Sequence, residues 1–161
     1  MMRSITTFSG EALLVDCIGC EVARGQLVNL AAVATQTKHF SVHQDVEIGL
    51  PGFLIISSLQ HLRSIQDMTP EMLNDFVLLM ARVRRAQTAS GFQDVIFLQN
   101  EDSADHFHFW SFPVHEWMRE YGRGITLLAN SVAELKTGKR RYSAEDVMIV
   151  LNQIRSALAG D

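Results

Sequence analysis

The chain has 161 residues, of which 47% are apolar and 20% are charged, and this composition excludes a disordered or collagen-like protein. A chain of this length can bury about 70% of the surface that it exposes when unfolded, so it needs no disulfide bonds to hold a core. With 14 basic and 18 acidic residues the formal net charge is −4, which excludes a general attraction to nucleic acid or anionic lipid.

The N-terminal segment lacks the pattern of a signal peptide or a membrane anchor. Its longest apolar run is Ala12–Val15, with Glu11 before it and Asp16 after it, and nothing in the chain approaches 18 unbroken apolar residues. We therefore expect a cytoplasmic protein that has no membrane partner. Cys17 and Cys20 follow, and in a reducing compartment such a pair is typical of a metal half-site, a redox motif or two buried thiols.

Two strands and a long helix are predicted for the first part of the chain. Residues 27–35 are apolar but fit either state. Residues 38–46 alternate loosely between polar and apolar side chains, and residues 52–57 are apolar and β-branched, so both stretches predict strands. A helix is predicted to begin at Thr69, because its hydroxyl can cap the first turn and Pro70 suits the first helical position.

The remainder of the chain changes from predicted strands to predicted helices after about residue 118. Apolar runs and turn residues predict two strands and then two helices, at residues 94–100, 106–112, 125–135 and 143–158. An acidic loop at residues 101–105 separates the two strands. We expect an α+β domain over residues 1–118 and a C-terminal helical extension over residues 119–161.

The second of these strands is the most informative segment for function. Alternate side chains of a strand share a face, so His106, His108, Trp110 and Phe112 are predicted to point one way. The residues between them are mostly apolar and would face a core, namely Phe107, Phe109 and Ser111. Two imidazoles on one face suit metal binding, acid–base chemistry or nucleophilic attack, and ordinary structural histidines are the alternative.

The segment His106-Phe107-His108-Phe109-Trp110-Ser111-Phe112-Pro113 resembles the signature of the histidine triad (HIT) superfamily of nucleotidyl hydrolases and transferases, in which histidines alternate with apolar residues. The resemblance covers roughly residues 16–113 and includes three more segments in the order that the family has. These segments are the pair Cys17 and Cys20, the run from Asp45 to His61, and the helix from Thr69.

The resemblance implies a fold, an assembly and an activity. The fold is an α+β structure with a five-stranded antiparallel sheet and a long helix, and the assembly is a homodimer. The activity is hydrolysis of nucleotidyl substrates, such as dinucleoside polyphosphates or nucleoside phosphoramidates, through a nucleotidyl-histidine intermediate. The partner would be a purine nucleotide or dinucleotide and not a nucleic acid polymer.

The resemblance also implies roles for particular residues. His108 matches the middle histidine, which attacks the α-phosphorus, and a free histidine with a pKa of about 6.5 is mostly neutral and nucleophilic at pH 7. Asp45 matches the acid that accepts hydrogen bonds from the ribose hydroxyls. Asn100 matches a polar residue near the substrate. Trp110 occupies the place of the third histidine, where an indole can stack on a base or donate one N–H.

A zinc site is implied as well. In family members with the two-cysteine opening, the first histidine of the motif joins the cysteines and one earlier histidine around a zinc ion. The matching set is Cys17, Cys20, His61 and His106, and such a closed set is typical of structural zinc. His106 therefore has two candidate roles, as a zinc ligand and as a catalytic residue beside His108.

Two departures from the family motivate a second hypothesis. Trp110 replaces a histidine, and the acidic loop 101–105 stands where the family has a longer loop that holds phosphate. The basic residues of 136–141 either reach a phosphate or form a solvated turn. The alternative function is therefore a zinc-clipped nucleotide-binding module with weak or no activity. A surface or core role is expected for the remaining histidines, His39, His43 and His115.

Overall fold

The computed structural model describes residues 2–27, 32–103 and 105–160 of the chain. Its centre is a five-stranded antiparallel sheet in the order β3-β4-β5-β7-β6, so the predicted α+β class is confirmed. The strands are β3 (Val33–Gln36), β4 (Phe40–Gln44), β5 (Leu54–Ser58), β6 (Val95–Gln99) and β7 (His108–Pro113). A separate hairpin of β1 (Arg3–Thr6) and β2 (Ala12–Val15) precedes them.

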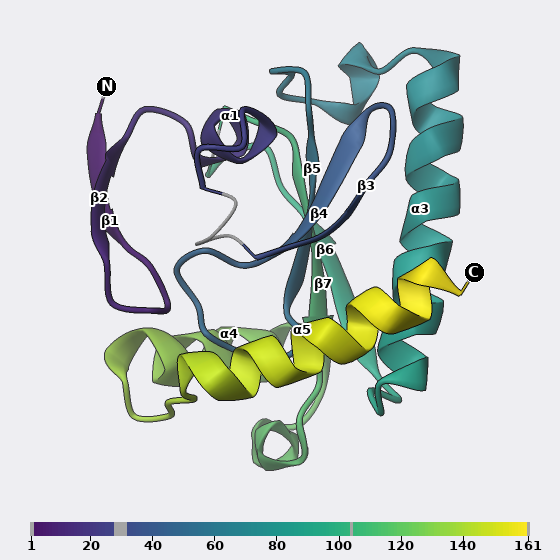
Figure 1. The fold of residues 1–161 in the computed structure, drawn as a ribbon. Coiled ribbons are helices and arrows are strands. Elements are labelled where there is room, and N and C mark those ends of the chain that lie inside the picture. The colour runs from purple at the N-terminus through teal and green to yellow at the C-terminus, as the bar shows by residue number, and fades with distance from the viewer. Residues whose placement is uncertain (1, 28–31, 104, 161) are drawn as a thin grey trace.

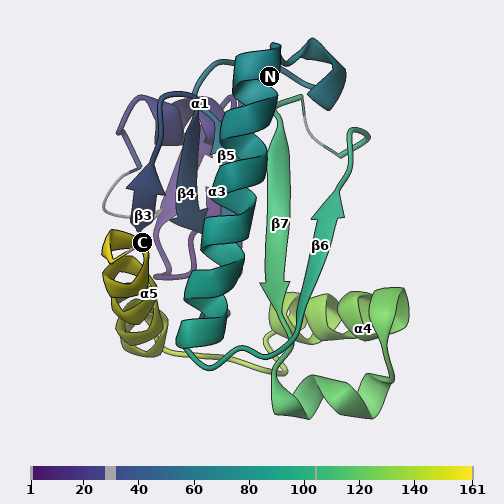
Figure 2. The same ribbon diagram turned by 90° about the vertical axis from the view of Figure 1, so that its right-hand side faces the viewer.

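The helices lie on both sides of the sheet. They are α1 (Ile18–Ala23), α3 (Pro70–Ala89), α4 (Gly124–Thr137) and α5 (Ala144–Ala159), with the 3-10 turns η1 (Ile65–Asp67) and η2 (Glu116–Tyr121). Figure 1 shows the hairpin and α1 on one side of the sheet and α3 on the other, and Figure 2 shows α4 near the end of β7. Among the described residues, no helix has the length and apolar character needed to cross a membrane.

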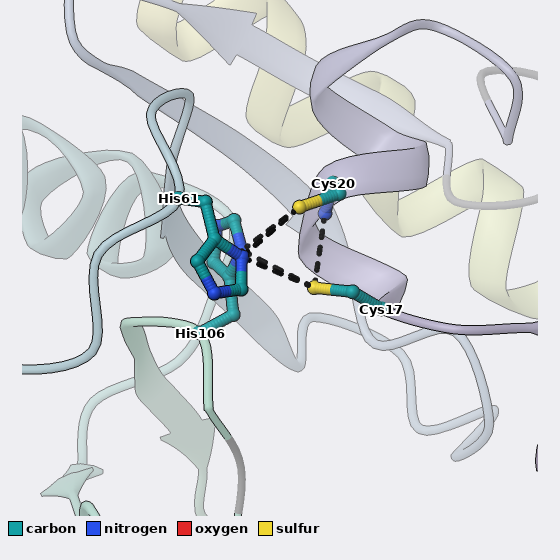
Figure 3. A group of neighbouring side chains, drawn as sticks. All are labelled: Cys17, Cys20, His61 and His106. Carbon is teal, nitrogen blue, oxygen red and sulfur yellow. Dashed lines mark hydrogen bonds between the residues drawn. The ribbon is translucent and has the colours of Figure 1, made fainter. Parts of the chain in front are cut away.

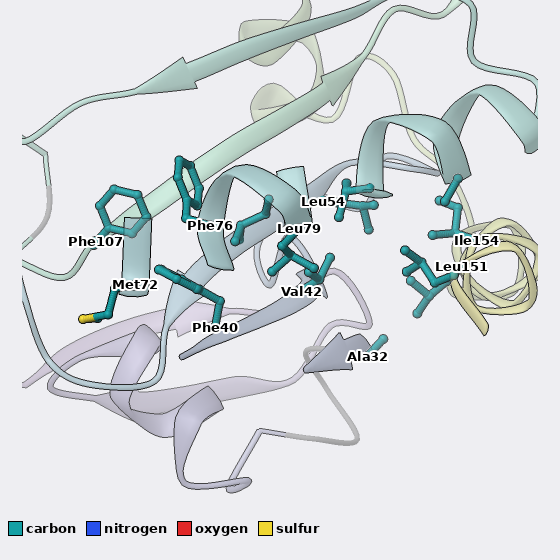
Figure 4. Packing of buried hydrophobic residues seen from close by; sticks show 14 of the residues in the cluster. Ala32, Phe40, Val42, Leu54, Met72, Phe76, Leu79, Phe107, Leu151 and Ile154 are labelled. Atoms are coloured by element: carbon teal, nitrogen blue, oxygen red, sulfur yellow. The ribbon is translucent and has the colours of Figure 1, made fainter. Parts of the chain in front are cut away.

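The main apolar core lies between the sheet and the helices α3 and α5 (Figure 4). Alternate residues of β4 and β5 point into it, because successive side chains of a strand face opposite ways. Its buried side chains include Phe40 and Val42 of β4, Leu54 and Ile56 of β5, Phe76, Leu79 and Val83 of α3, and Leu151 and Ile154 of α5. The sheet face toward α3 is therefore closed, and the opposite face is free to form a site.

A second apolar cluster closes part of that opposite face. Phe53 and Phe112 pack edge to face with ring centroids 5.0 Å apart, and Leu127 and Leu128 of α4 cover them. Because α5 packs in the main core and α4 in this second one, the helices of residues 119–161 take part in both clusters. The opposite face thus stays open only toward the start of β7.

The predicted elements are found with small shifts at their ends. The hydroxyl of Thr69 accepts the Met72 N–H at 3.3 Å, which confirms the predicted cap of the long helix. Of the ambiguous stretch 27–35, residues 33–35 belong to β3 and residues 28–31 lie outside the described residues. The hairpin, α1 and η2 had no predicted counterpart, because their short segments show no helical or strand periodicity.

One predicted boundary is wrong. The strand expected over residues 106–112 begins at His108, so His106 precedes it. The Phe107 N–H donates to the carbonyl of Leu62 at 2.6 Å, and Leu62 lies beyond the end of β5. The chain therefore enters β7 through a bend, and His106 lies in this bend, two residues before the strand begins.

Candidate functional site

Two cysteines and two histidines that are distant in sequence converge beside α1 (Figure 3). One ligand atom from each of Cys17, Cys20, His61 and His106 lies within 4.8 Å of all the others. The distances from sulfur to Nδ1 range from 3.2 to 3.9 Å. The two Nδ1 atoms are 3.3 Å apart.

These separations fit the edges of a tetrahedron around one metal ion. Zinc binds sulfur at about 2.3 Å and histidine nitrogen at about 2.05 Å, which requires edges of about 3.6 Å between sulfur and nitrogen and about 3.4 Å between two nitrogens. The observed distances scatter around these values. The donor set is thus compatible with a closed Cys2His2 zinc site.

The ring of His106 is oriented for such a role. Its Nε2 lies 2.8 Å from the carbonyl oxygen of Ser58, and a carbonyl only accepts, so Nε2 carries the proton. The lone pair of Nδ1 therefore faces the cysteines, as in metal sites where a second contact fixes the ligating ring. Burial lowers the pKa of His106, which favours the neutral form that binds metals.

The start of α1 brings the cysteines to these rings. Cys17 is the N-cap of α1 and its sulfur accepts the Cys20 N–H at 3.4 Å. A side chain at Gly19 would place Cβ only 2.4 Å from Cδ2 of His106, so a glycine is needed for this approach. Burial, followed by the neighbouring Cys17, raises the pKa of the Cys20 thiol to about 11, whereas redox motifs require a lowered pKa.

A cavity of about 590 Å³ lies next to this cluster. Its walls come from the hairpin, the start of α1, the strands β4, β5 and β7, the loop before β7 and the last turn of α4. Cavities of this volume hold small molecules such as nucleotides. The charged residues of the lining are Asp16, Asp45, Glu47, Asp105, Arg3 and Lys136, so acidic side chains outnumber basic ones.

His108 lines this cavity at the start of β7. Its Nδ1 lies 3.0 Å from the backbone carbonyl of His106, which only accepts, so Nδ1 carries the proton. The neutral ring then keeps its lone pair on Nε2. A partly exposed imidazole with a fixed tautomer and a bare Nε2 is suited to nucleophilic or general-base chemistry.

Asp45 follows β4 and also lines the cavity. One carboxylate oxygen accepts the backbone N–H groups of Glu47 at 3.0 Å and Ile48 at 2.7 Å. Burial raises the pKa of Asp45 to about 6, although these amides and the charge of Lys136 act in the opposite direction. The carboxylate is therefore an oriented acceptor that is ionised at neutral pH.

The other residues that the sequence singled out lie in two settings. Trp110 lines the cavity and packs edge to face on Phe53, with ring centroids 5.0 Å apart. Asn100 lies outside the lining, and its side-chain oxygen accepts the hydroxyl of Ser103 at 2.5 Å. Ser103 and Asp105 are the described members of the acidic loop that reach the cavity.

Three further cavity residues were missed or left aside by the sequence interpretation. His43 was assigned to the surface or core, Ser57 was not considered beyond its strand, and Lys136 was grouped with its basic neighbours. The strand pattern predicts the faces of His43 and Ser57 but not which strands lie next to theirs, and it says nothing of Lys136, which lies on α4. The sequence alone therefore does not place these residues at the cavity. Of the basic group, Lys139 instead pairs with Glu134.

Comparisons with known proteins agree with this architecture. No protein-family model and no curated protein sequence matches the chain. A zinc-bound histidine triad family protein from Mycobacterium smegmatis matches 90% of this chain and 94% of its own, with 16% identity and a TM-score of 0.63. A hypothetical histidine triad nucleotide-binding protein from Sulfolobus tokodaii matches 89% and 93%, with 13% identity and a TM-score of 0.62.

A shorter match points the same way. A HIT family hydrolase from Legionella pneumophila matches 63% of this chain and 95% of its own, with 19% identity and a TM-score of 0.51. At these identities the matches establish the fold. The sheet order, the long helix and the solved structures together show that the chain has the fold of the histidine triad superfamily.

Proposed function

We propose that the protein is a hydrolase of nucleotidyl substrates, with His108 as the nucleophile. The observation that carries this proposal is the fixed tautomer of His108, whose bare Nε2 belongs to a cavity large enough for a nucleotide. Matches named as a HIT family hydrolase and as a nucleotide-binding protein support the reaction class. Dinucleoside polyphosphates and nucleoside phosphoramidates are the proposed substrates, and the bound part is a purine nucleotide.

The reaction proceeds in two displacements. The Nε2 lone pair of His108 forms a bond to the α-phosphorus, and the bond from that phosphorus to the leaving oxygen or nitrogen breaks. The carbonyl of His106, which accepts a hydrogen bond from Nδ1–H, stabilises the positive charge that develops on the ring. Water then bonds to phosphorus, the bond between phosphorus and Nε2 of His108 breaks, and a nucleoside monophosphate is released. The proton that the water loses balances the proton that the leaving oxygen or nitrogen takes up.

The other cavity residues bind the substrate in this proposal. Asp45 accepts hydrogen bonds from the ribose hydroxyls, and Trp110 offers its ring to the nucleotide. Asn100 acts from outside the lining through its contact with Ser103. Because Trp110 cannot carry a positive charge, Lys136, which also lines the cavity, supplies a cation.

Zinc is proposed to bind Cys17, Cys20, His61 and His106 as a structural ion. Both ring nitrogens of His106 are then engaged, one by the metal and one by Ser58, so we assign His106 to the metal and not to catalysis. Such an ion would tie α1 to the loops that carry His61 and His106. It would also fix the carbonyl that orients His108.

The proposal is tested by a turnover screen over adenosine and guanosine nucleotidyl substrates. Wild-type protein is expected to release nucleoside monophosphate, and His108→Ala is expected to lower the rate by at least about a thousandfold with an unchanged melting temperature. His39→Ala is the matched control, because His39 lies away from the cavity and contacts Glu71 at 3.8 Å. Equal turnover by His108→Ala would exclude the mechanism.

The alternative is a nucleotide-binding module without significant turnover. It is favoured by the excess of acidic side chains around the cavity and by the replacement of the third histidine with Trp110. Calorimetry that detects nucleotide binding, together with no hydrolysis over hours, would support this alternative. Trapping of a nucleotidyl group on His108 by mass spectrometry would instead exclude it.

Assembly and location remain predictions. Apolar side chains stay exposed on one face of α3 and on the edge strand β6, namely Leu73, Val77, Leu78 and Phe97. A homodimer would cover them, as the resemblance implies, and light scattering of the purified protein would measure its mass. A cytoplasmic location is proposed together with this assembly, and fractionation of the cells that produce the protein would test it.

A further inference from the structure

The candidate zinc site is only partly covered by the rest of the protein. Of its four ligands, His106 is buried, whereas the two cysteines are half-buried and His61 is exposed. Cys17 also lines the cavity, so a small molecule that enters the cavity can contact this residue. Figure 3 shows the side chains of both cysteines pointing from the start of α1 toward the two imidazole rings. The cysteines are therefore accessible to small reagents in the folded protein.

The two sulfur atoms are close enough to be joined without unfolding α1. All four ligand atoms lie within 4.8 Å of one another, and Sγ of Cys17 is 3.4 Å from the backbone nitrogen of Cys20. Cys17 is the extended N-cap residue of α1, so its side chain can rotate while the helical hydrogen bonds stay intact. Cysteines with this spacing form disulfides in thiol oxidoreductases. The chain has no third cysteine that would compete for either sulfur.

Metal binding would keep both sulfur atoms in a form that oxidants attack. Cysteine binds a metal ion as the thiolate, and the thiolate is also the reactive form of the side chain. Cysteines that sense oxidants are accessible thiolates with a second, resolving cysteine beside them, and Cys17 with Cys20 has this arrangement in the metal-bound protein. This reactivity differs from that of a redox catalyst, because it depends on the bound metal and not on the acidity of the free thiols.

A disulfide would change which segments of the chain are tied together. With a metal bound, Cys17 and Cys20 join α1 to His61 and His106, which lie in the loops beside β5 and β7. A disulfide between the two cysteines would join the start of α1 only to itself. Residues 16–19 form one wall of the cavity, so loss of the metal would free this wall from the loops opposite.

We propose that Cys17 and Cys20 form a reversible redox modification site, at which peroxide produces a disulfide, releases the metal and frees the α1 wall of the cavity. This inference rests on the proposed zinc site. The thiolate of Cys17 attacks hydrogen peroxide, the O–O bond breaks, and a sulfenic acid and a hydroxide ion form. The thiolate of Cys20 then bonds to the Cys17 sulfur and displaces a second hydroxide. The two thiolates lose two electrons to the peroxide, and two protons from solvent convert both hydroxides to water.

Treatment of the zinc-loaded protein with a small excess of hydrogen peroxide, in the presence of a chromogenic chelator, tests this inference. We expect one zinc ion to be released per chain, while intact-protein mass spectrometry shows the loss of two hydrogen atoms. Oxidation of methionine is distinguished from this reaction because it adds oxygen to the mass. A reductant and added zinc should restore the metal-bound protein. A parallel sample without peroxide measures the metal that the chelator removes by itself.

Two single variants test which sulfur is attacked first. Cys20→Ser keeps Cys17, which lines the cavity, and Cys17→Ser keeps Cys20, which lies outside the lining. Neither variant can form the disulfide, so a sulfenic acid probe labels the sulfur that remains. At equal metal content, we expect labelling of Cys20→Ser to be at least about threefold faster, because its sulfur is the more accessible one. Equal labelling, or faster labelling of Cys17→Ser, would overturn the order of the two steps.

The outcomes separate this inference from the zinc site on which it rests. If the reduced protein binds no zinc, both are excluded. If zinc binds but peroxide oxidises methionine and leaves the metal in place, only the inference fails. Hydrogen exchange of residues 16–19 should increase in the oxidised protein, and Cys17→Ser/Cys20→Ser should show no change on addition of peroxide. Exchange that stays the same when the disulfide forms would exclude the proposed effect on the cavity wall.

Discussion

Two ionisable side chains of the cavity respond to pH in opposite senses. Burial raises the pKa of Asp45 from 3.8 to about 6 and lowers the pKa of His43 from 6.5 to about 4. Between pH 4 and pH 6, Asp45 binds more protons in the folded state than in the unfolded state. The contribution of Asp45 to the free energy of unfolding therefore falls as the pH rises. His43 binds more protons in the unfolded state than in the folded state. The contribution of His43 to the free energy of unfolding therefore rises with pH over nearly the same interval. The two slopes largely cancel in the wild-type protein.

Asp45→Asn is therefore expected to reveal the increase of stability with pH that is due to His43. Relative to wild-type protein, the free energy of unfolding of the variant should increase between pH 4 and pH 6, by up to about 3 kcal/mol above pH 6. Asparagine keeps the oxygen that accepts the amides of Glu47 and Ile48, so the loop is retained. Denaturant titrations of both proteins at several pH values measure this difference. Protonation of the cysteines and histidines of the metal site affects both proteins equally, so it does not contribute to the difference. A difference that is constant or decreases with pH would contradict the assignment.

The sequence predicts the candidate reactive and metal-binding residues of the site, but it does not predict which other side chains lie next to them. His108, the two cysteines and His61 belong to local motifs whose spacing is visible in one dimension. His43 and Ser57 lie near His108 only because β4 pairs with β5 and β5 pairs with β7, and the paired residues of β5 and β7 are 51 to 57 positions apart. Strand pairing over such separations leaves no trace in the local pattern, so side-chain periodicity predicts the face of a strand but not its neighbour.

At the scale of a single helix, Gly19 determines how closely α1 approaches the histidines. Alanine normally stabilises a helix by about 1 kcal/mol relative to glycine. At this position its Cβ would meet the ring of His106, which the Ser58 carbonyl holds in place. We expect Gly19→Ala to lower zinc affinity by about 10- to 100-fold, measured by competition with a chromogenic chelator.

The control for this prediction is Gly160→Ala, because a Cβ there would lie 3.8 Å from its nearest neighbour, which is an ordinary contact. This second variant should bind zinc as wild-type protein does. Zinc affinity that is unchanged in Gly19→Ala would show that His106 can move aside, and the proposed tetrahedral geometry would then lose its steric support.

The helix α4 contributes the cation Lys136 to the cavity, at the opposite end of the chain from the cysteines. An exposed cation stabilises a bound phosphate by a modest amount, so Lys136→Met is expected to weaken binding of adenosine 5′-monophosphate by about two- to fivefold. Binding of uncharged adenosine should not change, and the effect should vanish in 1 M salt, where charges are screened beyond about 3 Å. Calorimetry at two salt concentrations measures both.

Lys139→Met is the matched control on the following turn, since Lys139 pairs with Glu134 and lies outside the cavity lining. If both variants weaken binding equally, net charge and not the position of Lys136 is responsible. The sequence alone could not separate these two lysines. In the sequence, both lysines belong to one basic segment. In the structure, Lys136 on the last turn of α4 lines the cavity and Lys139 does not.

For the whole molecule, the change in sequence pattern after residue 118 corresponds to a change from strands to helices. The helices after this point still pack in the same apolar clusters as the strands before it. The described helices of residues 119–161 supply Leu127 and Leu151 to two apolar clusters, each of which also contains strand residues. Composition reports what each segment is made of. It does not report which core a helix joins, because that depends on contacts between segments that are distant in sequence.

The N-terminal region, in contrast, has a small apolar cluster of its own. Ile5, Val15 and Val22 of the hairpin and α1 pack with Val46, apart from the main core under α3. The four candidate zinc ligands join α1 to the loops beside β5 and β7. A metal clip therefore contributes most of its stabilisation to a region whose apolar packing is weakest, and its loss should cause local rather than global unfolding.

Hydrogen exchange of the zinc-loaded protein, before and after chelation, tests this expectation. We expect amide protection to decrease in residues 3–23 and around His61 and His106, while α3, α5 and the strands β4 and β5 keep theirs. The Cys17→Ser/Cys20→Ser variant should show the same pattern without a chelator and no further change when one is added. A uniform loss of protection would mean that the metal supports the whole core. Unchanged protection in metal-stripped protein would mean that the apolar cluster around Val22 holds the N-terminal region without it.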